Sequence, residues 1–328
     1  MTKPLIYLPK PLPPAVTDPL EQKFELFRAW QAGASEQHSP AIKERVQGIV
    51  TLGGRVDQAL MSRFPRLEIV ANYGVGYDIV DAAGAAERSI MVTNTPDVLN
   101  DEVADTAIGL LLMTIRNLGE AERYLRAGGW ESAPFRLSPV SMRGRKVGLV
   151  GLGRIGTGIA ERLVPFGVEI AYHSRSPRPE HPFQHFPDLV AMARHVNILI
   201  VIVPGGEQTR HLINAEVLDA LGTTGIVINV ARGSVIDEQA LITALKSGII
   251  LGAGLDVFEN EPYVPADLLE MDHVVLLPHV GSASVPTRNA MSQLVADNVI
   301  TWFDTGKALT PVSETAHIVR RTGPVHKD

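Results

Sequence analysis

Cysteine is absent from the 328-residue chain. Without cysteine there is no disulfide bond, no thiolate nucleophile and no Cys-ligated zinc or iron–sulfur site. An excess of basic residues is also lacking, because 30 Lys and Arg stand against 36 Asp and Glu and leave a formal net charge of −6. The chain therefore carries no electrostatic signature of a nucleic-acid partner.

Long apolar runs are missing as well. No stretch approaches the ~20 consecutive apolar residues that a membrane-spanning helix requires. The first residues, MTKPLIYLPK, have neither the apolar core nor the small-residue cleavage site of a secretory signal. We therefore expect a cytoplasmic protein with no membrane partner.

The length and the hydrophobic pattern indicate an α/β protein of two domains. A chain of this length corresponds to about two domains of ~100–200 residues each. Short apolar runs alternate with amphipathic stretches, which is typical of proteins with mostly parallel sheets.

The expected strands fall into two series, separated by a long helical segment. They cover residues 5–8, 48–52, 67–72 and 90–92, and then 147–150, 168–172, 197–203, 225–229, 251–256 and 274–277. Helical spacing is found over 19–30, 55–64, 78–88, 100–127 and 285–303. The long helix over 100–127 is expected to begin with Asn100 or Asp101 as its N-cap. Periodicity leaves open which domain the last helix packs on.

The segment from Gly151 to Gly156, GLGRIG, matches the dinucleotide-binding pattern G-x-G-x-x-G. An apolar strand precedes it and a helical pattern follows it, which is the context that this motif requires. Gly151 makes the tight turn, Gly153 lets the backbone approach a pyrophosphate, and Gly156 allows the helix to pack closely on the strand. A glycine-rich turn without a ligand is the alternative, and the context argues against it.

The next strand determines which nicotinamide dinucleotide is expected. A site specific for NAD places an acidic residue ~20 residues after the motif, where it accepts from the ribose 2′-OH. Here Glu169 comes too early, and Glu180 lies beyond the strand in a proline-rich loop. The strand ends instead at Ser174 and Arg175, whose hydroxyl and guanidinium suit a 2′-phosphate. The sequence thus favours NADPH, with a plain solvated loop as the alternative.

Three histidines, His173, His181 and His185, gather around the same proline-rich loop. Such a cluster raises the question of a metal site. Because no carboxylate pattern completes a ligand set, we interpret it as a polar surface loop and expect no metal.

Three later segments place a polar residue at or just after the end of an apolar strand. In open α/β sheets, ligands bind at the carboxyl ends of the strands. Hydride transfer to a 2-oxo acid needs an Arg to hold the carboxylate, a His to donate a proton, and a carboxylate to stabilise the protonated His. Arg232, His279 and Glu261 supply this set. Each also has an ordinary structural explanation when taken singly, and spacing alone does not show that they meet.

A set of segments stands in order along the chain: Asn72–Asp78, Val103–Asp105 with Gly109–Leu111, Gly151–Gly156, Asn229–Gly233, Gly254–Pro262 and Leu277–Ser282. Together they resemble the D-isomer-specific 2-hydroxyacid dehydrogenase family, and within it the glyoxylate/hydroxypyruvate reductase branch. The resemblance extends from Leu5 to about Leu309, and the ordered set is far more specific than any one motif.

The resemblance implies an α/β fold of two doubly wound parallel-sheet domains with a cleft between them. Residues 1–99 and 285–328 would form a flavodoxin-like substrate domain, and residues 100–284 an inserted Rossmann cofactor domain. It also implies a homodimer joined through an arm within residues 100–142. In that arm, Trp130 or Phe135 would shape substrate choice or pack in the interface.

The resemblance further assigns roles to single residues. Arg232 would bind the substrate carboxylate, His279 would be the acid–base catalyst, and Glu261 would support His279. Asp256 would hold the nicotinamide carboxamide. The residues expected to bind substrate are Gly53, Gly54, Val75, Gly76 and Arg232. The residues expected to bind the cofactor are Thr106, Gly151, Gly153, Arg154, Ile155, Gly156, Ser174, Arg175, Val203, Pro204, Val230, Asp256 and Gly281.

The implied function is an NADPH-dependent 2-oxoacid reductase that converts glyoxylate and hydroxypyruvate to glycolate and D-glycerate, with NADH as a weaker cofactor. One alternative keeps the chemistry and uses a larger 2-oxo acid, of the phenylpyruvate or 2-ketogluconate type. Another is a cofactor-sensing binding protein without turnover, against which the presence of Arg232, Glu261 and His279 argues. A structural oligomer without a cofactor would leave the glycine motif unexplained.

Overall fold

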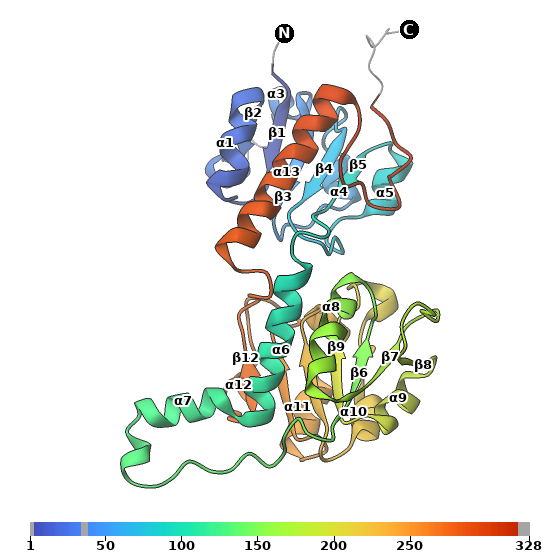
Figure 1. The fold of residues 1–328 in the computed structure, drawn as a ribbon. Coiled ribbons are helices and arrows are strands. Elements are labelled where there is room, and N and C mark those ends of the chain that lie inside the picture. Colours follow the sequence, from blue (N-terminus) through green and yellow to red (C-terminus); the bar gives the residue numbers. More distant parts are fainter. Residues whose placement is uncertain (1–2, 34–38, 321–328) are drawn as a thin grey trace. The chain divides into compact units, whose positions relative to one another are not determined.

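The computed structural model describes residues 3–33 and 39–320 of the chain (Figure 1). The chain divides into two compact units. Unit 1 consists of Met1–Leu99 with Ser284–Asp328, and unit 2 consists of Asn100–Ala283. Each unit contains one parallel sheet, which confirms the α/β class expected from the sequence. Within the described ranges, no helix has both the length and the apolar character needed to cross a membrane.

Unit 1 is built on five parallel strands in the order β2-β1-β3-β4-β5, which is the flavodoxin-like order. The strands are β1 (Leu5–Leu8), β2 (Glu25–Arg28), β3 (Val46–Thr51), β4 (Ile69–Asn72) and β5 (Met91–Thr93). The helices are α1 (Pro14–Lys23), α3 (Pro40–Lys43), α4 (Gln58–Met61), α5 (Ala82–Glu87) and α13 (Val285–Thr305), with a 3-10 turn η1 (Ala29–Gln31).

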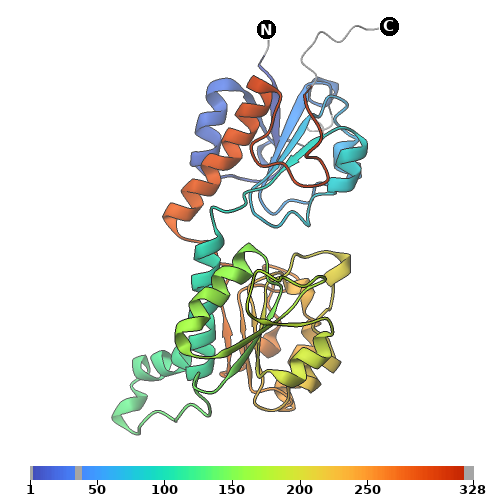
Figure 2. The same ribbon diagram turned by 45° about the vertical axis from the view of Figure 1, so that its right-hand side comes forward.

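The last helix, α13, belongs to unit 1, which answers the question that periodicity left open. It packs beside α1 and against β4 (Figure 2). Its N-cap is Ser284, whose Oγ accepts from the N–H of Thr287 at 3.3 Å. Trp302, buried near the other end of the helix, packs with Ile69 and Met91 of the sheet.

The helix expected over 19–30 is wrong in its second half. The helix begins earlier, at Pro14, because proline is favoured in the first turn, and it ends at Lys23. Residues Glu25–Arg28 instead form an edge strand paired with β1. The Phe27 ring stacks on Tyr7 with the ring centroids 5.8 Å apart, so burial against the sheet outweighs the helical spacing.

Unit 2 is built on seven parallel strands in the order β12-β11-β10-β9-β6-β7-β8. Counted from β6, this is the Rossmann order with one further strand at its end. The strands are β6 (Lys146–Val150), β7 (Glu169–His173), β8 (Gln184–Phe186), β9 (Ile198–Val201), β10 (Ile226–Asn229), β11 (Gly252–Leu255) and β12 (Val274–Leu276). The helices are α6 (Asn100–Arg116), α7 (Leu118–Arg126), α8 (Arg154–Leu163), α9 (Leu189–His195), α10 (Ala215–Leu221), α11 (Glu238–Lys246) and α12 (Ala266–Leu269).

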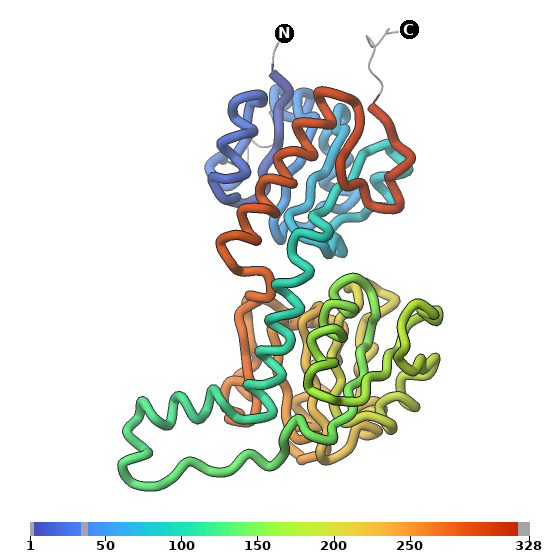
Figure 3. Tube along the Cα trace, viewed as in Figure 1, coloured from blue at the N-terminus to red at the C-terminus, as the bar shows by residue number. Residues whose placement is uncertain are grey.

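The long helix expected over 100–127 is broken at Asn117. This residue has φ of 52°, a left-handed conformation that asparagine tolerates better than most residues. The break separates α6, which packs on α8 and on the sheet, from α7. Residues 117–142, called the arm, leave the layers of unit 2 and return to β6 (Figure 3).

Candidate functional site

Because the strands of unit 2 are parallel, their carboxyl ends share one edge of the sheet, called the carboxyl edge. Gly151 follows β6 directly and Asp256 follows β11 directly. Arg232 comes shortly after β10, and His279 comes shortly after β12. The fold therefore places at one edge groups that are far apart in the sequence.

His279 forms a hydrogen bond with Glu261, in which Nδ1 lies 2.8 Å from Oε2. The other oxygen of Glu261 accepts from the N–H of Phe258 at 3.1 Å, so both carboxylate oxygens are engaged. Within residues 3–33 and 39–320, the Nε2 atom of His279 has no hydrogen-bond partner. The ring is thus anchored through one nitrogen and available through the other.

Electrostatics keep Glu261 ionised beside the imidazole. Burial raises the pKa of Glu261, but the hydrogen bond from His279 and the charges of His279 and Arg232 outweigh it. The pKa of Glu261 therefore lies below its ordinary value. Glu261 is therefore an ionised carboxylate where it meets Nδ1 of the His279 ring.

A turn organised by Asn229 presents Arg232. The Asn229 side chain donates from Nδ2 to the Arg232 carbonyl at 3.0 Å, and its Oδ1 accepts from the N–H of Ala231 at 3.0 Å. The Arg232 guanidinium donates through Nη1 to the Ala231 carbonyl at 2.7 Å. The Arg232 charge lies close enough to Glu261 to help lower the pKa of that carboxyl, so Arg232 shares the carboxyl edge with Glu261 and His279.

Gly233 joins the Arg232 turn to the loop that carries Glu261. A Cβ atom on Gly233 would stand 1.9 Å from the carbonyl carbon of Phe258 and 2.3 Å from the nitrogen of Glu259. Only glycine permits two backbones to approach this closely. Sequence reasoning missed this contact, for which the glycine after Arg232 was the one available signal.

Asp256 holds the backbone on which His279 stands. Its carboxylate accepts from the N–H groups of Val280 at 2.7 Å and Gly281 at 2.8 Å, and its carbonyl accepts from the N–H of His279 at 2.8 Å. His279 has φ of 54°, a conformation that costs a non-glycine residue about 1–3 kcal/mol and needs such support. Burial raises the pKa of Asp256, and the two N–H donors oppose that rise only in part.

Helix α6 also contributes to this turn. Thr106, on α6, donates from Oγ1 to the carbonyl of Gly281 at 3.3 Å. A Cβ atom on Gly281 would lie 3.0 Å from Oδ2 of Asp256, so a side chain there would press on the carboxylate. Thr106, Asp256 and Gly281 thus form one bonded group with the His279 turn.

The glycine motif has the shape that a dinucleotide requires. Gly151 has φ of 104°, and a Cβ atom there would lie 2.6 Å from the Ile202 carbonyl oxygen. A Cβ atom on Gly156 would lie 2.5 Å from the Gly151 carbonyl oxygen, so the helix packs tightly on the turn. Gly153 is different, because no atom lies within 4 Å of the place where its Cβ would stand. It is the N-cap of α8 and leaves the helix N-terminus open to a phosphate.

The end of β7 carries Ser174 and Arg175. Arg175 is exposed and makes no ion pair within the described part of the chain, while the Ser174 hydroxyl donates to the Ser176 carbonyl at 2.6 Å. Glu169 lies at the other end of β7, where it pairs with Lys146 at 3.1 Å and His195 at 2.6 Å. The Arg175 guanidinium at this end of β7 fits a 2′-phosphate better than a 2′-hydroxyl.

The three histidines of the neighbouring loop have backbone and side-chain partners. His173 Nδ1 lies 2.9 Å from the Phe186 carbonyl oxygen, and His185 Nε2 lies 3.0 Å from that of Ser174. His181 Nε2 lies 3.3 Å from the Thr157 hydroxyl. These bonds shape the loop beside Ser174. Among the residues described, no group of three or more His, Asp and Glu is placed to hold a metal ion.

The remaining expected cofactor residues lie along the same edge. Arg154 and Ile155 open α8, and Arg154 is exposed. Val203 and Pro204 follow β9, and a Cβ atom on Gly151 would lie 3.0 Å from Cγ1 of Val203. Val230 is buried directly after β10.

Glu259 was not expected from the sequence to take part. Its Oε1 accepts from Arg210 at 3.0 Å and lies 2.9 Å from Nε2 of His211. Its N–H donates to Glu238 at 3.3 Å. Arg210 and His211 belong to the segment that follows Pro204, so these bonds tie the loop of Glu261 to the segment after β9.

Unit 1 carries the expected substrate-binding glycines at the carboxyl ends of β3 and β4. Gly53 is exposed with φ of 67°, and its carbonyl accepts from Lys10 Nζ at 3.0 Å. The Gly54 N–H is already used, since it donates to Thr51 Oγ1 at 3.2 Å. Val75 and Gly76 are half-buried in the loop after β4. Of the two adjacent glycines Gly53 and Gly54, only Gly53 has an N–H without a partner in the described residues.

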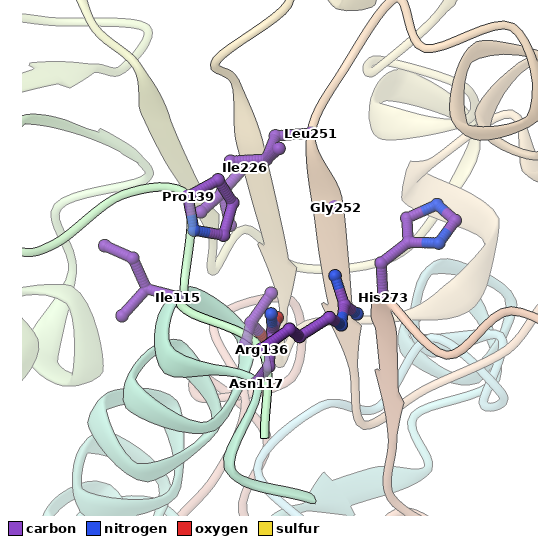
Figure 4. A pocket seen from close by; sticks show the side chains of 9 residues that line it. Ile115, Asn117, Arg136, Pro139, Ile226, Leu251, Gly252 and His273 are labelled. Atoms are coloured by element: carbon purple, nitrogen blue, oxygen red, sulfur yellow. The ribbon is translucent and has the colours of Figure 1, made fainter. Parts of the chain in front are cut away.

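A small cavity of about 50 Å³ lies at the opposite edge of the unit 2 sheet. It is lined by the end of α6, by Arg136 and Pro139 of the arm, and by residues at the starts of β10 and β11, with His273 before β12 (Figure 4). Arg136 is paired with Glu120. The cavity is remote from the carboxyl edge and has no part in the site.

Comparison with known proteins gives a consistent set of matches. The family model for the NAD-binding domain of D-isomer specific 2-hydroxyacid dehydrogenases matches residues 108–281. Glyoxylate/hydroxypyruvate reductase A of Arabidopsis thaliana is 45% identical over 306 residues, which are 92% of this chain and 96% of that protein. Hydroxyphenylpyruvate reductase of Plectranthus scutellarioides is 43% identical over 294 residues, which are 89% of this chain and 94% of that protein.

A solved structure resembles the whole chain. It is the NADPH-dependent glyoxylate/hydroxypyruvate reductase of Sinorhizobium meliloti in complex with NADP and malonate. It aligns with a TM-score of 0.91 and 55% sequence identity, covering 98% of this chain and 100% of that one.

Proposed function

The chain belongs to the D-isomer specific 2-hydroxyacid dehydrogenase family, and we propose that it is an NADPH-dependent reductase of glyoxylate and hydroxypyruvate. The observation that carries this proposal is the group formed by Arg232, Glu261 and His279 at the edge that also bears the glycine motif. The products are glycolate and D-glycerate, and the activity is that of an oxidoreductase acting on a CH–OH group.

The chain's own residues bind the 2-oxo acid and handle its proton. Arg232 holds the substrate carboxylate with its planar, permanently charged guanidinium. Protonated His279 donates from Nε2 to the carbonyl oxygen as negative charge develops there. Glu261 keeps the ring oriented through Nδ1 and stabilises its positive charge before the transfer. In the reverse direction the same ring accepts the proton of the 2-hydroxy acid.

The cofactor site is proposed at Gly151–Gly156, with Ser174 and Arg175 on the 2′-phosphate. Bound NADPH supplies the hydride that adds to C2 of the substrate. The open Gly153 and the N-terminus of α8 receive the pyrophosphate, and Asp256 and Thr106 lie near the His279 turn. Arg154, Ile155, Val203, Pro204, Val230 and Gly281 complete the proposed contacts.

Initial rates test the proposal directly. Oxidation of NADPH and of NADH is followed with glyoxylate and with hydroxypyruvate, under matched conditions. Fast turnover with NADPH and slower turnover with NADH is the expected result. Failure to oxidise NADPH with either acid, despite measurable NADPH binding, would contradict the proposed substrate.

A larger 2-oxo acid is the second candidate, and one observation favours it. The hydroxyphenylpyruvate reductase relative is nearly as similar to the chain as the glyoxylate/hydroxypyruvate reductase relative. A comparison of kcat/KM for glyoxylate, hydroxypyruvate and 4-hydroxyphenylpyruvate separates the two. We expect the small acids to have the higher kcat/KM.

We also propose a homodimer joined through the arm. Large apolar side chains are exposed along it, at Leu118, Leu125, Trp130 and Leu137. Apolar surface of this kind is typical of protein–protein interfaces. Size-exclusion chromatography with light scattering should give twice the 35.5 kDa mass of the chain, and the double variant W130S/L137S should elute as a monomer.

A further inference from the structure

In the loop that follows β4, three backbone carbonyl groups accept hydrogen bonds from asparagine side chains. Asn72 donates from Nδ2 to the carbonyls of Gly74 at 3.1 Å and Gly76 at 3.0 Å. Asn94 donates from Nδ2 to the carbonyl of Val75 at 2.8 Å. The Gly74 carbonyl also accepts from the N–H of Thr95 at 3.0 Å. Three consecutive carbonyls are therefore bonded inside unit 1.

The N–H groups of the same loop are left without partners. Within residues 3–33 and 39–320, the N–H groups of Val75 and Gly76 make no hydrogen bond. The loop is half-buried, and buried backbone N–H groups in proteins are almost always paired. Consecutive backbone N–H groups without internal partners are able to donate together to one anion. This loop is thus built to receive a negatively charged group.

The two asparagines are themselves held in place. Asn72 is buried as the last residue of β4. The Asn94 backbone is bonded on both sides to Thr310, by its N–H to the Thr310 carbonyl at 3.3 Å and by its carbonyl to the Thr310 hydroxyl at 2.7 Å. Asn298 of α13 in turn donates to the Thr310 hydroxyl at 2.8 Å. The Asn94 amide therefore has a fixed direction before any ligand arrives.

We infer that Asn72 and Asn94 are positioning residues, which build a carboxylate-binding site from the backbone N–H groups of Val75 and Gly76. Neither asparagine touches the ligand. By bonding the carbonyls of the loop, they direct its N–H groups outward. The inference rests on the proposed function, because the 2-oxo acid supplies the carboxylate.

The variant N94A tests this, because it removes the one donor that the described residues offer to the Val75 carbonyl, and it leaves β4 intact. We expect the KM for glyoxylate and the dissociation constant for oxalate to rise about tenfold, which is the usual effect of losing one such hydrogen bond. The dissociation constant for NADPH should stay within about twofold of wild type, because the proposed cofactor site lies in unit 2. N72D, of nearly unchanged shape, should act in the same direction.

The matched control is T315V. Thr315 is buried in the same unit and bonds the N–H of Val92 at 3.1 Å, on the strand that precedes Asn94. Its replacement should lower the melting temperature without changing the KM for glyoxylate. A merely structural role for Asn94 predicts that N94A and T315V behave alike.

The outcomes separate this inference from the proposed function. Calorimetry of oxalate binding to the NADP-bound protein needs no turnover. It therefore tests the role of Asn94 in carboxylate binding even if wild type reduces neither acid. Equal oxalate affinity in wild type and N94A, or no oxalate binding to wild type, would overturn the inference. So would an equal loss of NADPH and oxalate affinity in N94A.

Discussion

At the scale of single residues, the two nitrogens of His279 face different surroundings. Nδ1 is bonded to Glu261, and Nε2 has no partner in the described residues. A general acid needs this asymmetry, because one nitrogen fixes the ring and the other meets the substrate. Glu261, whose pKa is lowered, is a carboxylate at neutral pH.

Replacing Glu261 by Gln should therefore impair the proton transfer. We expect E261Q to lower kcat for glyoxylate about 100-fold, since the ring loses its orienting charge. NADPH affinity should be nearly unchanged. The matched control is E270Q, which alters an exposed carboxylate of the same unit. Equal kcat values for E261Q and E270Q would contradict the role given to Glu261.

The E261Q variant should also change how the free energy of unfolding depends on pH. Because the folded pKa of Glu261 lies below its ordinary value of 4.5, its interaction with His279 stabilises the fold above that pH. This stabilisation is lost as the pH falls through the lowered pKa. Urea unfolding of wild type and E261Q should show a gap in unfolding free energy near neutral pH that closes in acid. A difference in unfolding free energy that does not change with pH would contradict this stabilising role of Glu261.

The candidate catalytic residues could be predicted from the sequence, but the hydrogen bonds that support them could not. The sequence suggested Arg232, Glu261 and His279 as catalytic candidates from the chemistry that each can perform at a strand end. It could not identify Asn229 as the organiser of the Arg232 turn, or Asp256 as the support of the His279 turn. Those roles depend on hydrogen bonds between segments that meet only after the sheet has formed.

At the scale of elements, the β6 turn and the first turn of α8 use their glycines in different ways. Gly156 is required for packing, because its Cβ would collide with Gly151. Gly153 is not required for packing, because no atom lies within 4 Å of the place where its Cβ would stand. In the proposed cofactor site, this open backbone lets the pyrophosphate approach.

The variants G153A and G156A separate these two requirements. G153A should keep the melting temperature of wild type and lose at least about tenfold in NADPH affinity, because the methyl group occupies the pyrophosphate site. G156A should lower the melting temperature as well, because the helix is pushed off the turn. Thermal melts with and without NADPH measure both effects. Unchanged NADPH affinity in G153A would show that no dinucleotide binds there.

The loop after β7 should determine the choice between NADPH and NADH. R175A should raise the KM for NADPH about tenfold or more and leave the KM for NADH nearly unchanged, because only NADPH carries the 2′-phosphate. E169Q is the control, since Glu169 lies at the opposite end of β7 and should not affect either KM. An equal rise of both KM values in R175A would contradict the assignment.

Strands of the sheets were more predictable than helix ends. Continuous apolar runs gave most of the strands to within a few residues, because buried parallel strands leave few alternatives. Strand β2 was missed because its pairing with β1 overrides helical spacing, and the break at Asn117 was missed because asparagine is permitted within helices. Both errors arise from tertiary context, which periodicity does not contain.

At the scale of the whole molecule, the two units differ in the kind of group that each carries at the carboxyl ends of its strands. Unit 2 presents charged side chains and the glycine motif at its carboxyl edge, whereas unit 1 presents the backbone N–H groups of Val75 and Gly76. The sequence suggested a binding role for the glycine loops of unit 1 only through a family resemblance. The reason is that a site proposed on backbone groups has no characteristic side chain to detect.

The most direct test of the central claim is the turnover of H279A with glyoxylate at saturating NADPH, measured beside H273A. The two histidines flank the same strand, β12, with His273 before its start and His279 beyond its end. We expect H279A to lose about three orders of magnitude in kcat while its dissociation constant for NADPH stays within about twofold of wild type. H273A should match wild type in both. Comparable turnover in H279A and H273A would contradict the assignment of His279 as the proton donor.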